Sequence, residues 1–236
     1  STLMRSSAAS DVYKRQYLDY VQQGIYLWEN SPYVKNYPEL YFLNYVLFHR
    51  TNDEEIKPCR TYFWKKIKDK VQGKAMVEAA LEINHWCAGE VMYQGTDMRT
   101  GSALEIYRSG VGRCGEEAVF VVNVMRSAGI PARPVYVPRW SHCDDNHAWV
   151  EVWCDGDWHY LGACEPEAVL DKGWFTNAAS RAMMIGSRWY DRAMPDEKVI
   201  GKDGMNRIIN LLGKYAKTRW ITIRVEDLDG TPAAGA

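Results

Sequence analysis

Cys114 is the residue whose type and position best suit a nucleophile. It follows the glycine-containing stretch Ser109–Arg113 (SGVGR) and opens a segment whose apolar spacing predicts a helix. A thiol in the first turn of a helix lies near the positive end of the helix dipole and near free backbone N–H groups, and both favour the thiolate. Because a cysteine in this position also occurs as a small buried apolar side chain, a second residue has to support the hypothesis.

His147 is the candidate for that second residue. It follows a polar loop, residues 139–146, and opens the alternating segment His147–Trp153 (HAWVEVW), which predicts a strand. A nucleophilic thiol needs a base that takes its proton and returns it to a leaving amine, and the base needs a third group to orient it. A histidine at the end of a strand is common, so Cys114 and His147 support the catalytic hypothesis only together.

The segments that carry these two residues predict an α+β domain. The helix that begins at Cys114 has a buried apolar stripe and ends near Gly129, which is suited to a C-cap, and Pro131 prevents its continuation. The pair Asp155-Gly156 is a strong signal for a β-hairpin turn. Strands are predicted at Arg133–Pro138, His147–Trp153 and Trp158–Leu161.

The motifs in this region resemble those of a known family. The stretch Gly112–Val135 (GRCGEEAVFVVNVMRSAGIPARPV), followed by an H-x-W-x-E strand and a D-G hairpin into a W-x-Y strand, resembles the transglutaminase-like cysteine hydrolase superfamily. The resemblance covers about residues 75–170, with the motifs in the family's order. It implies a papain-like α+β core, a helix carrying the cysteine on a small antiparallel sheet, in which Cys114 and His147 match the first two members of a Cys-His-acid triad. The implied chemistry is acyl transfer or amide hydrolysis.

The third position of the triad departs from the family pattern. Relatives usually have an aspartate after the W-x-x-(L/V) strand, whereas this sequence has Gly162 there. We expect Glu165 to replace that aspartate, because its longer side chain could reach the imidazole from a later backbone position. A two-residue hairpin turn places Cys164 opposite His147, and a three-residue loop places Glu165 there. The alternatives are Glu167, Glu151 or no orienting acid.

The oxyanion that forms on a substrate carbonyl needs hydrogen-bond donors, and the backbone N–H of Cys114 is the expected first one. In relatives the second donor comes from the upstream helical region, where Trp86, Tyr93 and Gln94 are candidates and core packing is the simpler interpretation of the two aromatic residues. Arg133 and Arg139 could bind a substrate carboxylate, although solvated or ion-paired arginines are the simpler interpretation.

The cysteines do not predict a metal or disulfide framework. Six cysteines are present without a Cys-x-x-Cys pair, and a chain of 236 residues does not need disulfides to hold its core. Cys143 and His147 have a spacing that zinc tolerates, but the neighbouring ligand pairs are not arranged as in closed structural sites. We therefore expect no metal and no organic cofactor.

Composition and pattern divide the chain into four regions. Residues 1–16 contain SSAASDVYKRQ, which resembles translated sequencing-adapter sequence of metagenomic genes, and we expect a non-native or disordered leader there. Residues 17–100 are predicted to form a helical N-terminal region. Residues 101–213 are expected to form the transglutaminase-like catalytic core, with mixed helix and loop after residue 173. For residues 214–236 we expect a linker and the first strand of a truncated C-terminal β-sandwich-like module, because Arg219–Glu226 alternates as a strand. Helical segments are predicted at Leu18–Trp28, Leu40–Phe48, Thr61–Val71 and Ala75–Trp86.

The overall composition excludes several classes of protein. Lysine and arginine total 29 against 30 acidic residues, so there is no basic footprint for nucleic acid. The longest apolar stretch is far shorter than the roughly 20 residues of a membrane span. Ten tryptophans and fifteen tyrosines suit a core of large rings or an aromatic cleft. We expect a peptide or protein substrate, no nucleic acid and no transmembrane span, and the sandwich-like tail favours a periplasmic or extracellular location.

Three functions follow as hypotheses. The first is a cysteine amide or peptide hydrolase in which Cys114 attacks, His147 moves the proton, Glu165 orients His147 and water resolves the acyl-enzyme. The second is a protein-glutamine transglutaminase, in which an amine replaces water. The third is a catalytically silent binding or scaffold domain for a protein or polysaccharide, in which Gly162 marks a decayed triad.

Overall fold

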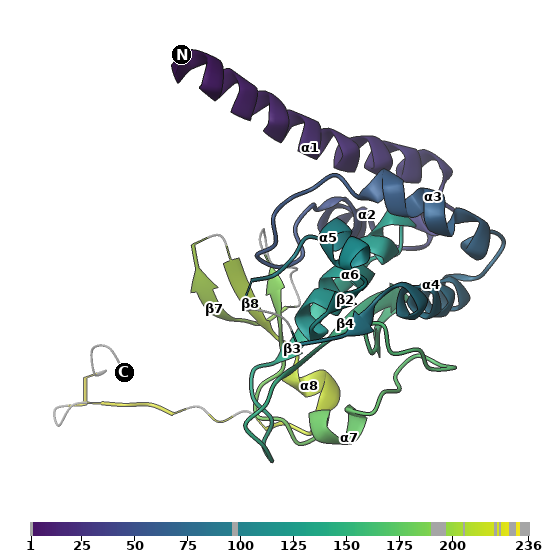
Figure 1. Ribbon diagram of the computed structural model, residues 1–236. Helices are drawn as coiled ribbons and strands as arrows, with labels where there is room; N and C mark the ends of the chain where they lie inside the picture. The colour runs from purple at the N-terminus through teal and green to yellow at the C-terminus, as the bar shows by residue number, and fades with distance from the viewer. Residues whose placement is uncertain are drawn as a thin grey trace.

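Helix α6 (Cys114–Ser127) lies at the centre of the fold, with helices on one side and a sheet on the other (Figure 1). Every residue from Glu116 to Ser127 is buried, so this helix packs on all of its faces. It contacts helices α3, α4 and α5 and strands β3 and β4. The computed structural model describes residues 2–95, 99–189, 197–204, 206–219, 221, 223–226 and 230–231.

The sheet is antiparallel and six-stranded over the described residues, in the order β5-β4-β3-β6-β8-β7. Its strands are β3 (Ala132–Val137), β4 (His147–Cys154), β5 (Asp157–Leu161), β6 (Gly186–Trp189), β7 (Val199–Asp203) and β8 (Asn206–Asn210). Two further short strands, β1 (Met92–Tyr93) and β2 (Val111–Gly112), pair in parallel outside this sheet. The predicted α+β core, a cysteine-bearing helix packed on an antiparallel sheet, is confirmed.

The hairpin between β4 and β5 has the predicted two-residue turn. Cys154 pairs with Asp157, and the two residues between them have positive φ angles, 52° at Asp155 and 92° at Gly156. Positive φ at both central residues is the geometry that matches the twist of paired strands, which explains the Asp-Gly sequence. Paired residues extend only as far as Leu161, so β5 ends before the position opposite His147.

The N-terminal part of the chain is helical, as expected. Helix α1 extends through residues 2–16, so the backbone of the segment expected to be a non-native or disordered leader is helical here, and the helix runs outward from the rest of the fold (Figure 1). The elements of this part are α1 (Thr2–Asn30), the 3-10 helix η1 (Val34–Asn36), α2 (Glu39–Phe42), the π-helix η2 (Leu43–Leu47), α3 (Arg60–Val71), α4 (Met76–Glu90) and α5 (Ala103–Ser109).

The region after residue 173 differs from the mixed helix and loop expected there. It contains the short helix α7 (Thr176–Ala179), but strands β6, β7 and β8 then extend the sheet. These strands are short and mix charged with apolar residues, so their sequence lacks the alternation that predicts a strand. Their pairing with β3 and with each other supplies the regular structure.

The first residues of the expected linker, at the end of helix α8 (Leu212–Tyr215), belong to the core. This helix contacts the sheet, because the Tyr215 hydroxyl donates to the Glu151 carboxylate over 2.6 Å. The described residues of the expected strand at Arg219–Glu226 lie in no named strand, and residues 227–229 lie outside the described part of the chain.

Arg133 forms a buried ion-pair network within the sheet. Its side chain is 3% exposed, and its Nε donates to the Glu151 carboxylate over 2.7 Å while a second nitrogen pairs with Glu197. The guanidinium also lies 4.1 Å from the centre of the Trp158 ring. Arg139, by contrast, is exposed and pairs with Asp144. Both arginines are therefore ion-paired.

Loss of the Arg133 charge should destabilise the protein strongly. The change Arg133→Ala leaves the buried Glu151 carboxylate with only the Lys214 ammonium, 3.8 Å away, as a cation, and such losses cost about 3–5 kcal/mol of unfolding free energy. The matched change Arg139→Ala removes an exposed pair and should cost less than about 1 kcal/mol. Urea denaturation of the three proteins measures both values, and similar costs for the two changes would contradict the prediction.

Candidate active site

The start of α6 fixes the position of Cys114. Arg113 is the extended N-cap residue, and its N–H donates to the Glu116 carboxylate over 3.2 Å. The other oxygen of Glu116 accepts from the N–H of Gly101 over 3.0 Å, which attaches the preceding loop to the helix start. Cys114 is therefore held at the first turn, where the backbone N–H groups have no partner within the helix.

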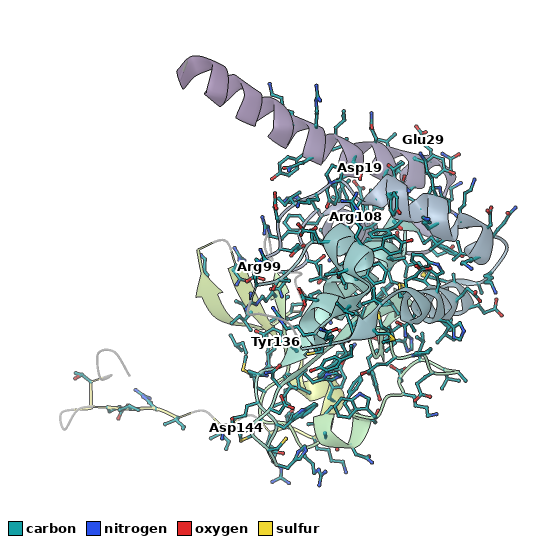
Figure 2. The ribbon with its side chains drawn as sticks, in the orientation of Figure 1. Asp19, Glu29, Arg99, Arg108, Tyr136 and Asp144 are labelled. Carbon is teal, nitrogen blue, oxygen red and sulfur yellow. The ribbon has the colours of Figure 1, made fainter. Side chains whose placement is uncertain are left out.

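Cys114 and His147 line the same cavity. The cavity has a volume of about 340 Å³ and lies between the start of α6, the start of β4 and strand β3. In Figure 2, Tyr136 marks the wall that β3 contributes, and Asp144 marks the polar loop that leads to His147. The thiol also lies against the backbone N–H of Ala148, the residue after the histidine.

Burial keeps both members of the pair neutral in the free protein. It raises the pKa of the Cys114 thiol, and the N–H groups of Ala148 and Gly115 lower that pKa by less. Burial also lowers the pKa of His147 to about 4. The helix start thus favours the thiolate as expected, but desolvation outweighs it. The cavity therefore holds a neutral thiol and a neutral imidazole at neutral pH.

The imidazole of His147 lies in an aromatic pocket. Its ring centre is 4.7 Å from that of Trp174 and 5.1 Å from that of Phe175, and Trp140 and Trp149 pack nearby. The Nε2 atom is buried without a hydrogen-bond partner in the described part of the chain. The rings therefore fix the imidazole plane and leave one nitrogen available to an acceptor.

Glu165 occupies the space that a side chain at position 162 would need. A Cβ added to Gly162 would lie 2.2 Å from Oε2 of Glu165 and 2.8 Å from its Cβ. Glycine at position 162 is thus a steric requirement of this arrangement. The Glu165 carboxylate therefore lies where a side chain at position 162 would lie.

The strand register places this carboxylate on the side of the sheet that carries the histidine. Val150 pairs with Leu161, the last paired residue of β5, and continuing the same register by one residue would put Gly162 opposite Trp149. Opposite residues share a face, and residues two apart on a strand do so too, which puts the side-chain space of Gly162 on the face of His147. Oε2 of Glu165 is buried without a partner in the described residues, like Nε2 of the histidine.

Trp174 connects the carboxylate to the imidazole. Its indole N–H donates to Oε1 of Glu165 over 2.9 Å, while its ring packs on His147. Burial raises the pKa of Glu165, and the indole hydrogen bond lowers it by less. Sequence analysis missed Trp174, because nothing in its local pattern relates it to the acid or to the histidine.

Asn84, on α4, holds the loop that carries Glu165. Its side-chain amide donates to the carbonyl oxygen of Gly162 over 2.9 Å and to that of Glu165 over 3.4 Å. Its carbonyl oxygen accepts from the N–H of Cys164 over 3.1 Å. Cys164 has a φ of 57°, a left-handed conformation that is uncommon for a residue with a side chain. The buried amide stabilises this tight turn and thereby the acid.

The other expected residues lie elsewhere. Glu151 is committed to Arg133 and Tyr215, and Glu167 pairs with Lys172 over 2.8 Å. None of Trp86, Tyr93 and Gln94 lines the Cys114 cavity. Trp86 packs on Tyr107 and Phe120, as the core interpretation predicted, and Tyr93 is 68% exposed.

Glu117 is a buried carboxyl group beside the site that the sequence did not single out. It lies one helical turn after Cys114, and burial together with the nearby charge of Glu165 raises its pKa to about 8. It is therefore protonated at neutral pH. Its ionisation would place a second negative charge near the thiol and near Glu165.

The described residues carry neither a metal-binding cluster nor a membrane-spanning helix. They contain no cluster of three or more His, Cys, Asp and Glu side chains arranged to hold a metal ion. Within the part of the chain that the structure describes, no helix has the length and apolar character needed to cross a membrane.

Comparison with known families agrees with this geometry. Residues 65–163 match the family model of the transglutaminase-like superfamily, so this segment, with Cys114, His147 and Gly162, is a transglutaminase-like domain. The match ends before Glu165. The predicted family resemblance is confirmed, and the members of this superfamily are mostly cysteine hydrolases.

Solved structures that are similar to this chain share little sequence with it. A proposed cysteine protease from Cytophaga hutchinsonii has 19% identity, with 64% of this chain and 57% of that chain covered and a TM-score of 0.37. LapG from Legionella pneumophila has 17% identity and a TM-score of 0.38, and the match covers 47% of this chain and 66% of that chain. A proposed protease from Parabacteroides distasonis has 17% identity and a TM-score of 0.41, and the match covers 54% of this chain and 25% of that chain. The chain thus spans less than two thirds of each of these proteins, and no curated protein matches it.

The raised pKa of Glu117 makes the stability of the protein depend on pH. The ordinary pKa is 4.5 and the folded value about 8, so between them the folded chain keeps a proton that the unfolded chain releases. This contribution to the unfolding free energy is present below pH 4.5 and is lost as the pH rises to about 8. The change Glu117→Gln removes the titrating group and its pH dependence. The unfolding free energy of the variant should therefore rise relative to that of the wild type from pH 5 to pH 8, by at most about 1.4 kcal/mol per pH unit.

Urea denaturation at both pH values measures this difference. The exposed change Glu39→Gln is the control and should show no comparable trend. A constant difference between Glu117→Gln and the wild type would show that Glu117 does not keep its proton in the folded state.

Proposed function

We propose that this protein is a cysteine hydrolase that cleaves amide or peptide bonds through an acyl-enzyme. The observation that carries the proposal is that Cys114 and His147, from separate elements, line one cavity of about 340 Å³. In the proposed reaction the sulfur of Cys114 attacks the substrate carbonyl as the imidazole of His147 accepts the thiol proton. The imidazolium then protonates the leaving amine, and water releases the acyl group.

General-base catalysis suits the neutral pair that burial produces. With its pKa lowered to about 4, the imidazole of His147 is unprotonated, and therefore able to accept a proton, at any pH well above that value. The thiol does not need to ionise beforehand, because its proton can move during the attack. The N–H groups at the start of α6 then face the oxyanion.

Glu165 is proposed as the orienting acid. Its Oε2 and the Nε2 of His147 are both buried and unpartnered, and a hydrogen bond between them would satisfy two atoms that are costly to leave without one. Such a bond would leave Nδ1 of the imidazole for the thiol. In the present structure no hydrogen bond joins the two side chains, and small shifts that close such contacts often accompany substrate binding.

The acyl-transfer activity can be tested with p-nitrophenyl acetate, which reports on any nucleophilic thiol. We expect the wild type to release more than one equivalent of p-nitrophenol, the Cys114→Ala variant to release none above background, and His147→Ala to be slower by about 10²–10⁴-fold. The rate should fall as the pH drops through about 4, where His147 gains a proton. The exposed Cys143→Ala and the half-buried His159→Ala, in which His159 pairs with Asp171, are matched controls.

The fate of the acyl group separates the alternatives. Acetate as the product with water, and cleaved peptides from a defined peptide mixture, support a hydrolase. Acetylated monodansylcadaverine, formed in preference to acetate when that amine is added, would identify a transglutaminase. Release that is unaffected by Cys114→Ala would contradict both enzymes and leave the silent binding domain.

The exchange of positions 162 and 165 tests the orienting acid directly. Glu165→Gly should lower the rate strongly, since loss of an orienting carboxylate from a comparable triad costs up to about 10⁴-fold. Adding Gly162→Asp to that variant places an acid at the family's usual position and removes the clash, so the double variant should recover much of the rate. Gly162→Asp alone should fold poorly, because its side chain would overlap Glu165.

Circular dichroism and urea denaturation show whether each variant is folded before its rate is compared. Equal rates for folded Glu165→Gly and the wild type would exclude Glu165 as the orienting acid. A folded double variant as slow as Glu165→Gly would show that the two positions do not place a carboxylate at the same point.

A further inference from the structure

The cavity beside Cys114 is lined by positive charge. Its described lining includes two arginines, Arg113 and Arg188, and no aspartate or glutamate. The remaining walls are apolar or neutral, with Asn52, Tyr136 and Asn146, while Asp145 does not line the cavity although its charge acts on His147. A cavity with a low-dielectric wall and one sign of charge concentrates ligands of the opposite sign.

Arg188 is held at the cavity by neutral groups. It comes from β6, and its Nη1 donates to the side-chain oxygen of Asn52 over 2.8 Å. Its guanidinium carbon lies 6.0 Å from the centre of the Tyr136 ring; burial raises the pKa of that phenol, and the charge of Arg188 lowers it by less. Both described partners are uncharged at neutral pH, so the positive charge of Arg188 is fixed in direction without being cancelled by them.

Arg113 brings a second guanidinium to the thiol. A Cβ added to Gly115 would lie 2.9 Å from Nη1 of Arg113, so this group packs against the backbone next to Cys114. Its Nη2 donates to the Thr100 hydroxyl over 3.1 Å. A cation at the N-terminus of a helix opposes the helix dipole, so helix stability does not explain an arginine there.

The other arginines considered for this role are engaged elsewhere. Arg133 is buried with Glu151 and Glu197, and Arg139 pairs with Asp144 on the surface. Neither of them lines the Cys114 cavity. The planar guanidinium of Arg188 is suited to bind a carboxylate through two parallel hydrogen bonds.

We propose that the Cys114 cavity selects acyl donors that carry a carboxylate close to the reacting carbonyl, as in an acidic peptide, and that Arg188 binds this carboxylate. The substrate class rests on the proposed hydrolase function, whereas carboxylate binding beside the thiol does not. A cavity of about 340 Å³ has room for an aspartate or glutamate side chain next to the peptide bond.

Two alkylating reagents test this without any enzymatic turnover. Iodoacetate and iodoacetamide react with the same thiolate, and only iodoacetate carries a carboxylate. The ratio of their rates at Cys114, measured by peptide mass mapping, therefore does not depend on the fraction of thiolate. We expect this ratio to exceed that of N-acetylcysteine at least about tenfold at low ionic strength, and to fall toward it as salt screens the charges.

Variants assign the effect to Arg188. Arg188→Gln should lower the ratio toward that of N-acetylcysteine, Arg188→Lys should retain part of it, and the surface control Arg139→Gln should leave it unchanged. The exposed Cys143 of the same molecules, which lies beside Asp144, is an internal reference that should show no preference for iodoacetate.

The outcomes separate this proposal from the catalytic one. A wild-type ratio equal to that of N-acetylcysteine at low salt would overturn carboxylate selection even if p-nitrophenyl acetate is hydrolysed. A raised ratio that Arg188→Gln leaves unchanged in a folded variant would overturn the assignment to Arg188. A raised ratio that depends on Arg188 supports carboxylate binding even if no hydrolysis is found.

Discussion

The burial of helix α6 against β3 and β4 is the constraint on which the rest of the structure depends. Residues 116–127 of this helix are covered on every face, and protein cores are close-packed, so the helix cannot shift without repacking its neighbours. Its first residue, Cys114, therefore has a fixed position at the edge of the core. Strand β4, which packs on the same helix, begins at His147. The presence of thiol and imidazole in one cavity is thus a consequence of core packing.

The same burial controls the charges of the site. Desolvation disfavours the ionised form of each group, so Cys114 and His147 are neutral, and Glu117 keeps its proton. A site of this kind holds little charge until a substrate arrives, and its chemistry depends on proton transfer during attack. The guanidinium of Arg188 is different, because arginine stays charged at any accessible pH. It leaves the resting cavity positive.

The relation between Gly162 and Glu165 shows how one volume can be filled from two backbone positions. The side-chain space of position 162 accepts a single carboxylate, and a tight turn held by Asn84 delivers it from position 165. Once it is there, a side chain at position 162 has no room, so the glycine and the glutamate depend on each other. The buried charges of the sheet, Arg133 with its two glutamates, form a separate network that supports the strands.

The sequence by itself determined the local features: the helix that begins at Cys114, the hairpin at Asp155-Gly156, and the thiol and imidazole as a candidate pair. Each of these follows from short-range spacing or from the backbone preference of one or two residues. Only the tertiary structure decided the edge strands after residue 173, the contact of Trp174 with both His147 and Glu165, and the position of Arg188 beside the thiol. These features join segments far apart in the chain, and they arise from packing and strand pairing, which local periodicity does not record.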